Sequence, residues 1–311
     1  MRTGRPRMLA ASMPSLSPLH ALLALAVVFV WGTNFVVIKL ALGDLPPLLL
    51  AALRFLLALL PAALLLPRPH VGIGNLAGYG LLIGAGQFGL LYIAMDGHIS
   101  PGLASLVVQT QVFFTIGLAM WFAHEPLRAF QAVAVLLSAV GLGIVGWHTD
   151  ATTTLPGLVL VLGAAAAWAG GNILTKRAGS INMLAYVVWP SAFSVPVLFG
   201  LSLAFEGWDA IVQGVSRATV GTWVAVGWQA WANTLFGYAA WSWLLSRYSA
   251  AAVTPMALLV PVFGMGASAL WLGEPLPAWK LVAAALVISG LAINLMWPHL
   301  RRQWAAKVPT A

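Results

Sequence analysis

Long apolar segments of helical length follow one another along almost the whole chain, and few charged residues interrupt them. A bilayer core of about 30 Å requires about 20 residues of α-helix for each crossing. The runs are continuous, as in 51–66, whereas barrel strands would alternate, so an all-α membrane protein is expected. Glycine, proline and charged positions divide the chain into ten expected spans, at 19–41, 47–66, 74–95, 100–122, 128–147, 155–177, 183–205, 219–245, 250–272 and 278–297.

The composition agrees with a polytopic membrane protein. Hydrophobic residues make up 61% of the chain and charged residues 7%, whereas soluble domains carry about 25% charged residues. The connections are short except for 206–218, which is long enough for a small surface helix, so no separate soluble domain is expected. The first span, of about 23 residues, exceeds the 7–15 of a signal peptide and is expected to stay in the mature protein.

The basic residues predict the orientation. With the N-terminus in the cytoplasm, eleven of the fifteen lysines and arginines fall at inner ends, and only Lys39, Arg217 and Lys280 fall at outer ends. This bias predicts that both termini are cytoplasmic. It also accounts for the net charge of +8, so no nucleic-acid partner is expected, and binding of anionic membrane lipids is the alternative reading of that charge.

The chain repeats itself internally. Residues 31–39 and 168–176 both begin with Trp, end with Lys eight positions later and contain an Asn in a similar place. The tripeptide Glu-Pro-Leu occurs at 125–127 and 274–276, each followed by a glycine sixteen residues after its Glu. Each half holds five spans, an odd number, so the second half must insert upside down. The expected organisation is a tail at 1–18, repeats at 19–147 and 155–297, and a tail at 298–311.

These motifs resemble the ten-helix drug/metabolite transporter superfamily, in its EamA branch, over residues 19–297. Further motifs of the first half are similar to those of members that export cysteine and O-acetylserine. The resemblance implies efflux of amino acids or related metabolites, and another member exports aromatic amino acids, so the substrate stays open. The first-half motifs are Trp31-Gly32, Pro46-Pro47-Leu48, Leu53-Arg54-Phe55, Gln87-Phe88, Gly102-Leu103-Ala104-Ser105-Leu106-Val107 and Gln109-x-Gln111-x-Phe113-Phe114.

Polar side chains in the middle of spans indicate a cavity between the halves, because they are costly toward lipid. The alternative for each is a hydrogen bond to a neighbouring helix, or packing in the case of the tryptophans. The fifth and tenth spans lack such residues and are expected to be packing or dimer helices, in a monomer or homodimer. The candidate substrate-binding residues are Asn34, Gln87, Gln109, Asn172, Trp31, Trp168, Arg54, Gln111, Trp228 and Asn233.

Arg54 is the one firmly charged residue within a span. An arginine there can bind a substrate carboxylate with two parallel hydrogen bonds. The alternatives are that its side chain reaches toward the outer headgroups or pairs with Asp44 or Asp96.

The remaining features bear on mechanism. Every acid falls at a span end or in a loop, which favours facilitated export of a small molecule by alternating access. Proton-coupled export of other metabolites or drugs, or a channel-like pore, are the alternatives. The sequence contains no H-E-x-x-H, G-x-S-x-G or P-loop motif and no cysteine, so neither an enzyme nor a cofactor or metal is expected. The glycines at 80 and 84 predict close helix packing.

Overall fold

The computed structural model describes residues 16–123, 126–150 and 152–307, whose regular secondary structure is helical, with no strand. Nine helical segments in these ranges are long and apolar enough to cross a membrane. The eighth expected span is the continuous helical run 220–247, which is not among the nine. Polar residues such as Gln229 and Asn233 lower its hydropathy. The chain therefore has the expected ten helical segments, nine of them strongly apolar.

Five of the ten segments are single helices, and the other five change helical type or are interrupted along their length. The single helices are α1 (Pro18–Ala41), α2 (Pro47–Leu65), α7 (Ala129–Trp147), α8 (Leu155–Ala178) and α16 (Ala278–Lys307). The composite segments are α3 (Ile73–Gly80), η1 (Leu81–Gly89) and α4 (Leu90–Met95); α5 (Pro101–Val107), η2 (Val108–Thr110) and α6 (Gln111–Ala123); α9 (Met183–Val188) and α10 (Ser191–Phe205); α12 (Val220–Gly227), η3 (Trp228–Phe236) and α13 (Gly237–Arg247); and α14 (Ala250–Val253), η4 (Thr254–Leu258) and α15 (Leu259–Leu272).

The loops contain the residues that start and stop these helices. The side chains of Ser17, Thr154 and Thr219 each accept a hydrogen bond from the backbone N–H three residues later, as N-caps do. Proline occupies the first turn of α1 and α8, where its missing N–H costs nothing. Gly273 ends α15 in the left-handed region, with φ +67°.

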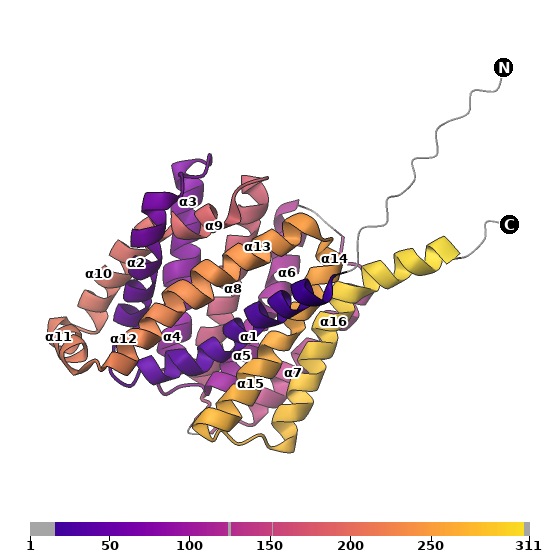
Figure 1. Cartoon of the computed structure of the whole chain (residues 1–311). Helices are drawn as coiled ribbons and strands as arrows, with labels where there is room; N and C mark the ends of the chain where they lie inside the picture. The colour runs from indigo at the N-terminus through magenta and orange to yellow at the C-terminus, as the bar shows by residue number, and fades with distance from the viewer. Residues whose placement is uncertain (1–15, 124–125, 151, 308–311) are drawn as a thin grey trace.

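The packing of the helices repeats in the two halves. Helix α1 packs against α15 as α8 packs against α6, and α1 contacts α12, η3 and α13 as α8 contacts α3, η1 and α4. The remaining large contacts pair equivalent helices, α2 with α10 and α7 with α16, which lie side by side in Figure 1. Each contact thus has a counterpart under exchange of the halves, as two inverted repeats require. This supports the fold expected from the sequence repeat.

The same symmetry extends to irregular helix. The third and eighth segments each contain nine residues of π-helix, η1 and η3, at equivalent positions. The fourth and ninth each contain a short 3₁₀ turn, η2 and η4. Such departures from α-helix are rare and gather at functional sites. Their recurrence in both halves marks the third and eighth segments as the place to look for a site.

The glycines at 80 and 84 bring the third segment against α10. A Cβ on Gly84 would overlap the Cβ of Ser194, and one on Gly80 would overlap the carbonyl oxygen of Pro190. The hydroxyl of Ser194 donates to the carbonyl oxygen of Gly80 at 2.8 Å. The close packing predicted from the two glycines is confirmed.

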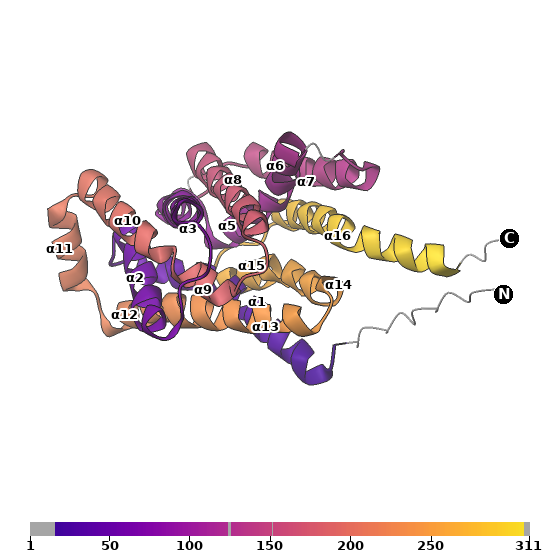
Figure 2. The ribbon, with the colours of Figure 1, turned by 90° about the horizontal axis from the view of Figure 1, so that it is seen from above.

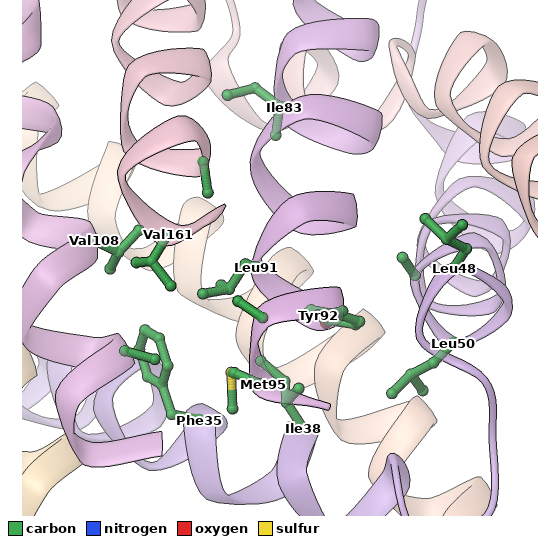
Figure 3. Close-up of a cluster of buried hydrophobic side chains, with 14 of the residues drawn as sticks. Phe35, Ile38, Leu48, Leu50, Ile83, Leu91, Tyr92, Met95, Val108 and Val161 are labelled. Atoms are coloured by element: carbon green, nitrogen blue, oxygen red, sulfur yellow. The ribbon is translucent and has the colours of Figure 1, made fainter. Parts of the chain in front are cut away.

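The apolar core lies where α1, α4 and α8 converge (Figure 3). Ile38, Leu91, Met95 and Val161 have no more than 2% of their surface exposed. Tyr92 lies in the same cluster and is fully buried, so its hydroxyl must find a partner inside the protein.

The expected surface helix in 206–218 is α11 (Trp208–Arg217), at the edge of the molecule opposite the chain ends (Figure 2). It buries Ile211 and Gly214 and exposes most of its other residues. Helix α16 continues to Lys307, beyond the expected end of the last span at 297. Residues 1–15, which hold most of the expected N-terminal tail, and the first Glu-Pro-Leu glutamate lie outside the described residues.

Two carboxylates tie the halves together. Glu206, after α10, accepts hydrogen bonds from the backbone N–H of Leu48 at 2.6 Å and of Leu49 at 3.2 Å, at the start of α2. Glu274, before α16, accepts one from the N–H of Gly102 at 3.0 Å, at the start of α5. A carboxylate at a helix N-terminus is stabilised by the helix dipole. Each glutamate of the second half thus caps a helix of the first.

Glu274 also belongs to a buried ion pair. Lys280 Nζ lies 2.9 Å from Glu274 Oε1, and both side chains are less than 10% exposed. The hydroxyls of Ser100 and Ser268 donate to the same carboxylate. Burial raises the pKa of the Glu274 carboxyl, but the two hydroxyls and the charged, hydrogen-bonding Lys280 outweigh it, so the pKa lies below its ordinary value.

Candidate functional site

Arg54 lies at the centre of a buried polar cluster made by three segments. Its side chain, on α2, is only 1% exposed. Nη1 donates to Tyr92 Oη on α4 at 2.9 Å, and Nη2 donates to Thr234 Oγ1 on η3 at 2.8 Å. The guanidinium carbon lies 4.0 Å from the centre of the Phe88 ring, a favourable cation–π distance. The planar guanidinium thus links segments of both halves around one positive charge.

The two side chains bonded to Arg54 make further hydrogen bonds within the eighth segment or to it. The hydroxyl of Tyr92 donates to Gln229 Oε1, and Gln229 Nε2 donates to the carbonyl oxygen of Ala225 at 3.2 Å. Thr234 Oγ1 donates to the carbonyl oxygen of Gln229 at 2.9 Å, five residues back. Because η3 is π-helical, this carbonyl lies within reach of Thr234. The π-helix therefore helps to place the Thr234 hydroxyl against the guanidinium.

None of these partners neutralises the charge of Arg54. No carboxylate of a described residue lies within ion-pair distance of it, and its Nε has no hydrogen-bond partner in the described part of the chain. The alternatives expected from the sequence are therefore wrong. The buried side chain does not reach the headgroups, Asp44 accepts a hydrogen bond from Thr222, and Asp96 is exposed. A buried cation without an anion is costly, so the cluster is suited to attract an anion.

A cavity adjoins the cluster between α2, the third segment, the seventh segment and the eighth. Its free space of about 10 Å³ is near the size that one water molecule needs. An organic substrate can enter only if the surrounding helices or side chains move. The lining residues are Arg54, Phe55, Tyr79, Gly80, Ile83, Phe88, Val187, Pro190, Ser191, Ser194, Thr234 and Tyr238.

Trp31 joins the first segment to this region. Its indole Nε1 donates to the carbonyl oxygen of Asn233 at 3.1 Å. Its ring lies 5.7 Å from that of Tyr238, which lines the cavity, and 5.1 Å from that of Trp241. Gly237 permits this approach, since a Cβ there would overlap the indole nitrogen. Trp31 and Arg54, both expected from the sequence, thus bond to consecutive residues of the eighth segment, Asn233 and Thr234.

Asn172 and Gln111 form a separate pair. Asn172 Nδ2, on α8, donates to Gln111 Oε1 at 2.7 Å and to Thr115 Oγ1 at 3.1 Å, both on α6. The bond joins two neighbouring helices, which is the structural alternative to lining a substrate cavity. Neither residue lines the cavity beside Arg54.

Asn34 and Asn172 are not equivalent. When Trp31 is aligned with Trp168 and Lys39 with Lys176, Asn34 falls opposite Gly171. A Cβ on Gly171 would overlap the side chain of Ile83, so this position in α8 is a packing contact. One residue turns an α-helix by about 100°. The two asparagines, which occupy a similar but not identical place in the repeats, therefore face different neighbours.

The other expected residues are largely buried without being gathered at one point. Asn34, Gln87, Gln109 and Asn233 are less than 10% exposed. Asn34 Oδ1 and Trp228 Nε1 are buried with no hydrogen-bond partner among the described residues, which leaves both able to bond a further molecule. Trp168 packs against the apolar core.

The sequence did not single out Tyr92, Thr234 or Ser194. Gln229 and Tyr238, which belong to the eighth segment, are likewise outside the ten candidates. The signal available for Thr234 was its place directly after Asn233 in a span with unusually many polar residues. Tyr92 offered none, because a lone tyrosine near the end of a span is more often an interface residue.

Ten helical segments, inverted internal symmetry and a buried polar cluster shared by both halves define a membrane transporter rather than an enzyme. Residues 18–147 and 155–296 each match the EamA-like transporter family. The chain belongs to this family.

Relatives of similar length support this assignment. A "Probable amino-acid metabolite efflux pump" of Salmonella typhimurium is 39% identical, over 90% of this chain and 96% of its own length. A protein of the same description in Escherichia coli is 38% identical, over 92% and 97%. A "Probable terminal-alkyne amino-acid exporter" of Streptantibioticus cattleyicolor is 26% identical, over 86% and 90%. A crystal structure covering 90% of this chain and 96% of its own superposes with a TM-score of 0.60 at 17% identity, which shows the shared fold.

Proposed function

We propose that this protein exports amino acids and related metabolites from the cytoplasm through a cavity between its two halves. The observation that carries the proposal is the buried, unneutralised guanidinium of Arg54, held by Tyr92 from the first half and Thr234 from the second. A site shared by two inverted repeats can face either side of the membrane as the repeats rock. Amino acids carry a carboxylate, which the guanidinium can bind with two hydrogen bonds.

The remaining candidates would line the path on either side of Arg54. Asn34 and Trp228, with their unpartnered buried atoms, are the strongest of them. Asn172 and Gln111 would have to exchange their mutual hydrogen bond for one to the substrate. The proposed substrate-binding residues are Asn34, Gln87, Gln109, Asn172, Trp31, Trp168, Arg54, Gln111, Trp228 and Asn233.

The proposed setting is the bacterial inner membrane, with both termini cytoplasmic and repeats at 19–147 and 155–297. The positive-inside bias supports the orientation. The bacterial origin of the relatives above supports the membrane. Since α7 and α16 pack against each other and leave apolar residues such as Leu136 exposed, a monomer in lipid and a homodimer through this face both fit.

Alternating access is supported by the small volume of the cavity. Its space holds about one water molecule, so a substrate must enter in a different arrangement of the helices. The described carboxylates lie at helix ends or in loops, away from the Arg54 cluster. This arrangement favours transport driven by the substrate gradient over coupling to an intramembrane proton carrier.

The test is efflux from proteoliposomes containing the purified protein and loaded with radiolabelled leucine, phenylalanine or O-acetylserine. We expect saturable efflux that unlabelled substrate outside accelerates, as a carrier requires and a pore does not. Arg54→Gln should abolish it, whereas the exposed Arg217→Gln on α11 should not. Efflux without saturation would show a pore, and accumulation dependent on a proton gradient would show a coupled pump.

A further inference from the structure

The cavity beside Arg54 carries charge of one sign only. Of its lining residues, Arg54 is the one with a charged side chain, and the others are aromatic, aliphatic or hydroxyl residues. An amino acid in its common form has both a carboxylate and an ammonium group. The cavity provides a counter-charge for the first and none for the second. The inference that follows rests on the proposed function, since it concerns the same site.

The six carboxylates of the described residues are engaged elsewhere or lie at the surface. Glu206 and Glu274 cap α2 and α5, and Glu274 is also paired with Lys280. Asp44 accepts a hydrogen bond from Thr222, and Asp150 accepts one from Thr152. Asp96 and Asp209 are exposed. None of these six lines the cavity.

The hydroxyl groups of the cavity cannot replace a carboxylate. Ser194 donates its proton to the carbonyl oxygen of Gly80, and Thr234 donates to that of Gln229 while accepting from Arg54. A hydroxyl accepts a hydrogen bond from an ammonium group but leaves its charge uncompensated. In a buried site the repulsion between that charge and the guanidinium is weakly screened. An ammonium group beside Arg54 therefore weakens binding, whereas a neutral nitrogen or hydroxyl there does not.

We propose that the preferred substrates are carboxylates whose α-substituent is uncharged, such as N-acyl amino acids and 2-hydroxy acids, ahead of the zwitterionic amino acids. Arg54 binds the carboxylate, and the neutral hydroxyl and aromatic groups around it surround the α-substituent. Export then moves one negative charge outward per molecule. An inside-negative membrane potential drives this movement, because an anion is repelled from the negative side.

The experiment compares molecules that share a side chain and differ in charge. Leucine, N-acetyl-leucine, 2-hydroxyisocaproate and isoamylamine compete with labelled leucine for transport in proteoliposomes. We expect the two anions to reach half-inhibition at concentrations at least about tenfold below that of leucine, and the amine not to compete. An inside-negative potassium diffusion potential should accelerate efflux of labelled N-acetyl-leucine and leave efflux of labelled leucine unchanged.

Variants separate charge recognition from folding. Arg54→Lys keeps the positive charge. It should still bind the anions more tightly than the zwitterion, although all of them more weakly than wild type does. Arg54→Gln should abolish transport of the anions and of leucine alike, and Arg217→Gln should keep the order. If leucine is transported and competes as well as the two anions, this inference is wrong while the proposed function stands. If neither leucine nor the anions are transported by folded protein, the proposed function fails as well.

Discussion

Gly141 on α7 and Gly290 on α16 occupy equivalent points of one interhelical contact. A Cβ on Gly141 would lie 2.9 Å from the carbonyl oxygen of Ala283, and one on Gly290 would lie 2.6 Å from that of Ala134. Ala134 precedes Gly141 by the same seven residues that separate Ala283 from Gly290. Each helix therefore offers the other the same surface, as in a contact across a two-fold axis.

Replacing Gly290 with Ala should destabilise the protein, because the added methyl group overlaps the backbone of α7. Overpacking of this kind costs about 1–3 kcal/mol. Thermal unfolding in detergent measures it. Gly143→Ala is the matched control on α7, since nothing lies within 4 Å of its Cβ position. Equal melting temperatures for the two variants would show that α7 and α16 do not meet at Gly290.

Glu274→Gln should destabilise the protein at neutral pH, and the difference from wild type should shrink in acid. The pKa of Glu274 is lowered in the folded protein. Its stabilising contribution is therefore complete above the unfolded value of about 4.3 and is lost as the pH falls through the lower folded value. Melting temperatures from pH 7 down to pH 3 measure this. A constant difference between variant and wild type across that range would contradict it.

Asn34→Ala and Asn172→Ala should differ in their effects. Asn34 Oδ1 has no partner among the described residues, so its loss should leave stability unchanged and weaken transport. Asn172 is bonded to Gln111 and Thr115, so its loss should cost about 0.6–2 kcal/mol of stability. Melting temperature and the apparent KM of leucine efflux are measured for both variants. If Asn172→Ala is as stable as wild type and transports leucine unchanged, Asn172 has neither a structural role nor a role in substrate binding.

Tyr92→Phe should weaken binding of carboxylates without preventing it. The change removes the hydrogen bond that Arg54 Nη1 donates to the tyrosine and the one that the tyrosine donates to Gln229. Loss of a hydrogen bond to a charged group, about 1.5–3 kcal/mol, corresponds to a rise in apparent KM of roughly 13- to 160-fold. Tyr248→Phe, at the end of α13 and bonded to His20, is the control. Equal KM values for the two variants would show that Tyr92 does not contribute to substrate binding.

Reporter fusions test the proposed orientation. A fusion after Ala311 and one within 68–72 should report a cytoplasmic location, and one within 148–154 a periplasmic location. The basic residues at the inner ends of the spans are the physical reason. Labelling of intact cells with a membrane-impermeant reagent provides the independent measurement. A periplasmic C-terminus on transport-competent protein would overturn the orientation.

The fold could be read from the sequence because the bilayer imposes length and hydropathy on every span. The Trp–Lys spacing and the two Glu-Pro-Leu turns were enough to indicate the repeat. The π-helices η1 and η3 could not be predicted, since nothing in their composition distinguishes them from α-helix. They depend on contacts between segments, such as the bond from Arg54 to Thr234.

The site was harder to predict because it joins residues far apart in the chain. Arg54 was identified as the charged residue within a span, yet Tyr92 lies 38 residues away from it and Thr234 lies 180 away. Asn34 and Asn172 are offset by one residue in the aligned repeats. On a helix this offset turns a side chain by about 100°, so the two asparagines face different neighbours.

The ion pair of Glu274 and Lys280 makes the two ends of the transporter unequal. In the first half the positions corresponding to Ser268 and Lys280 hold Ala119 and Gln131, which carry neither a hydroxyl nor a positive charge. Separating the helices at this end breaks an ion pair and the hydrogen bonds from Ser100 and Ser268, so we expect opening toward this side, the outer side in the proposed orientation, to be the more costly movement.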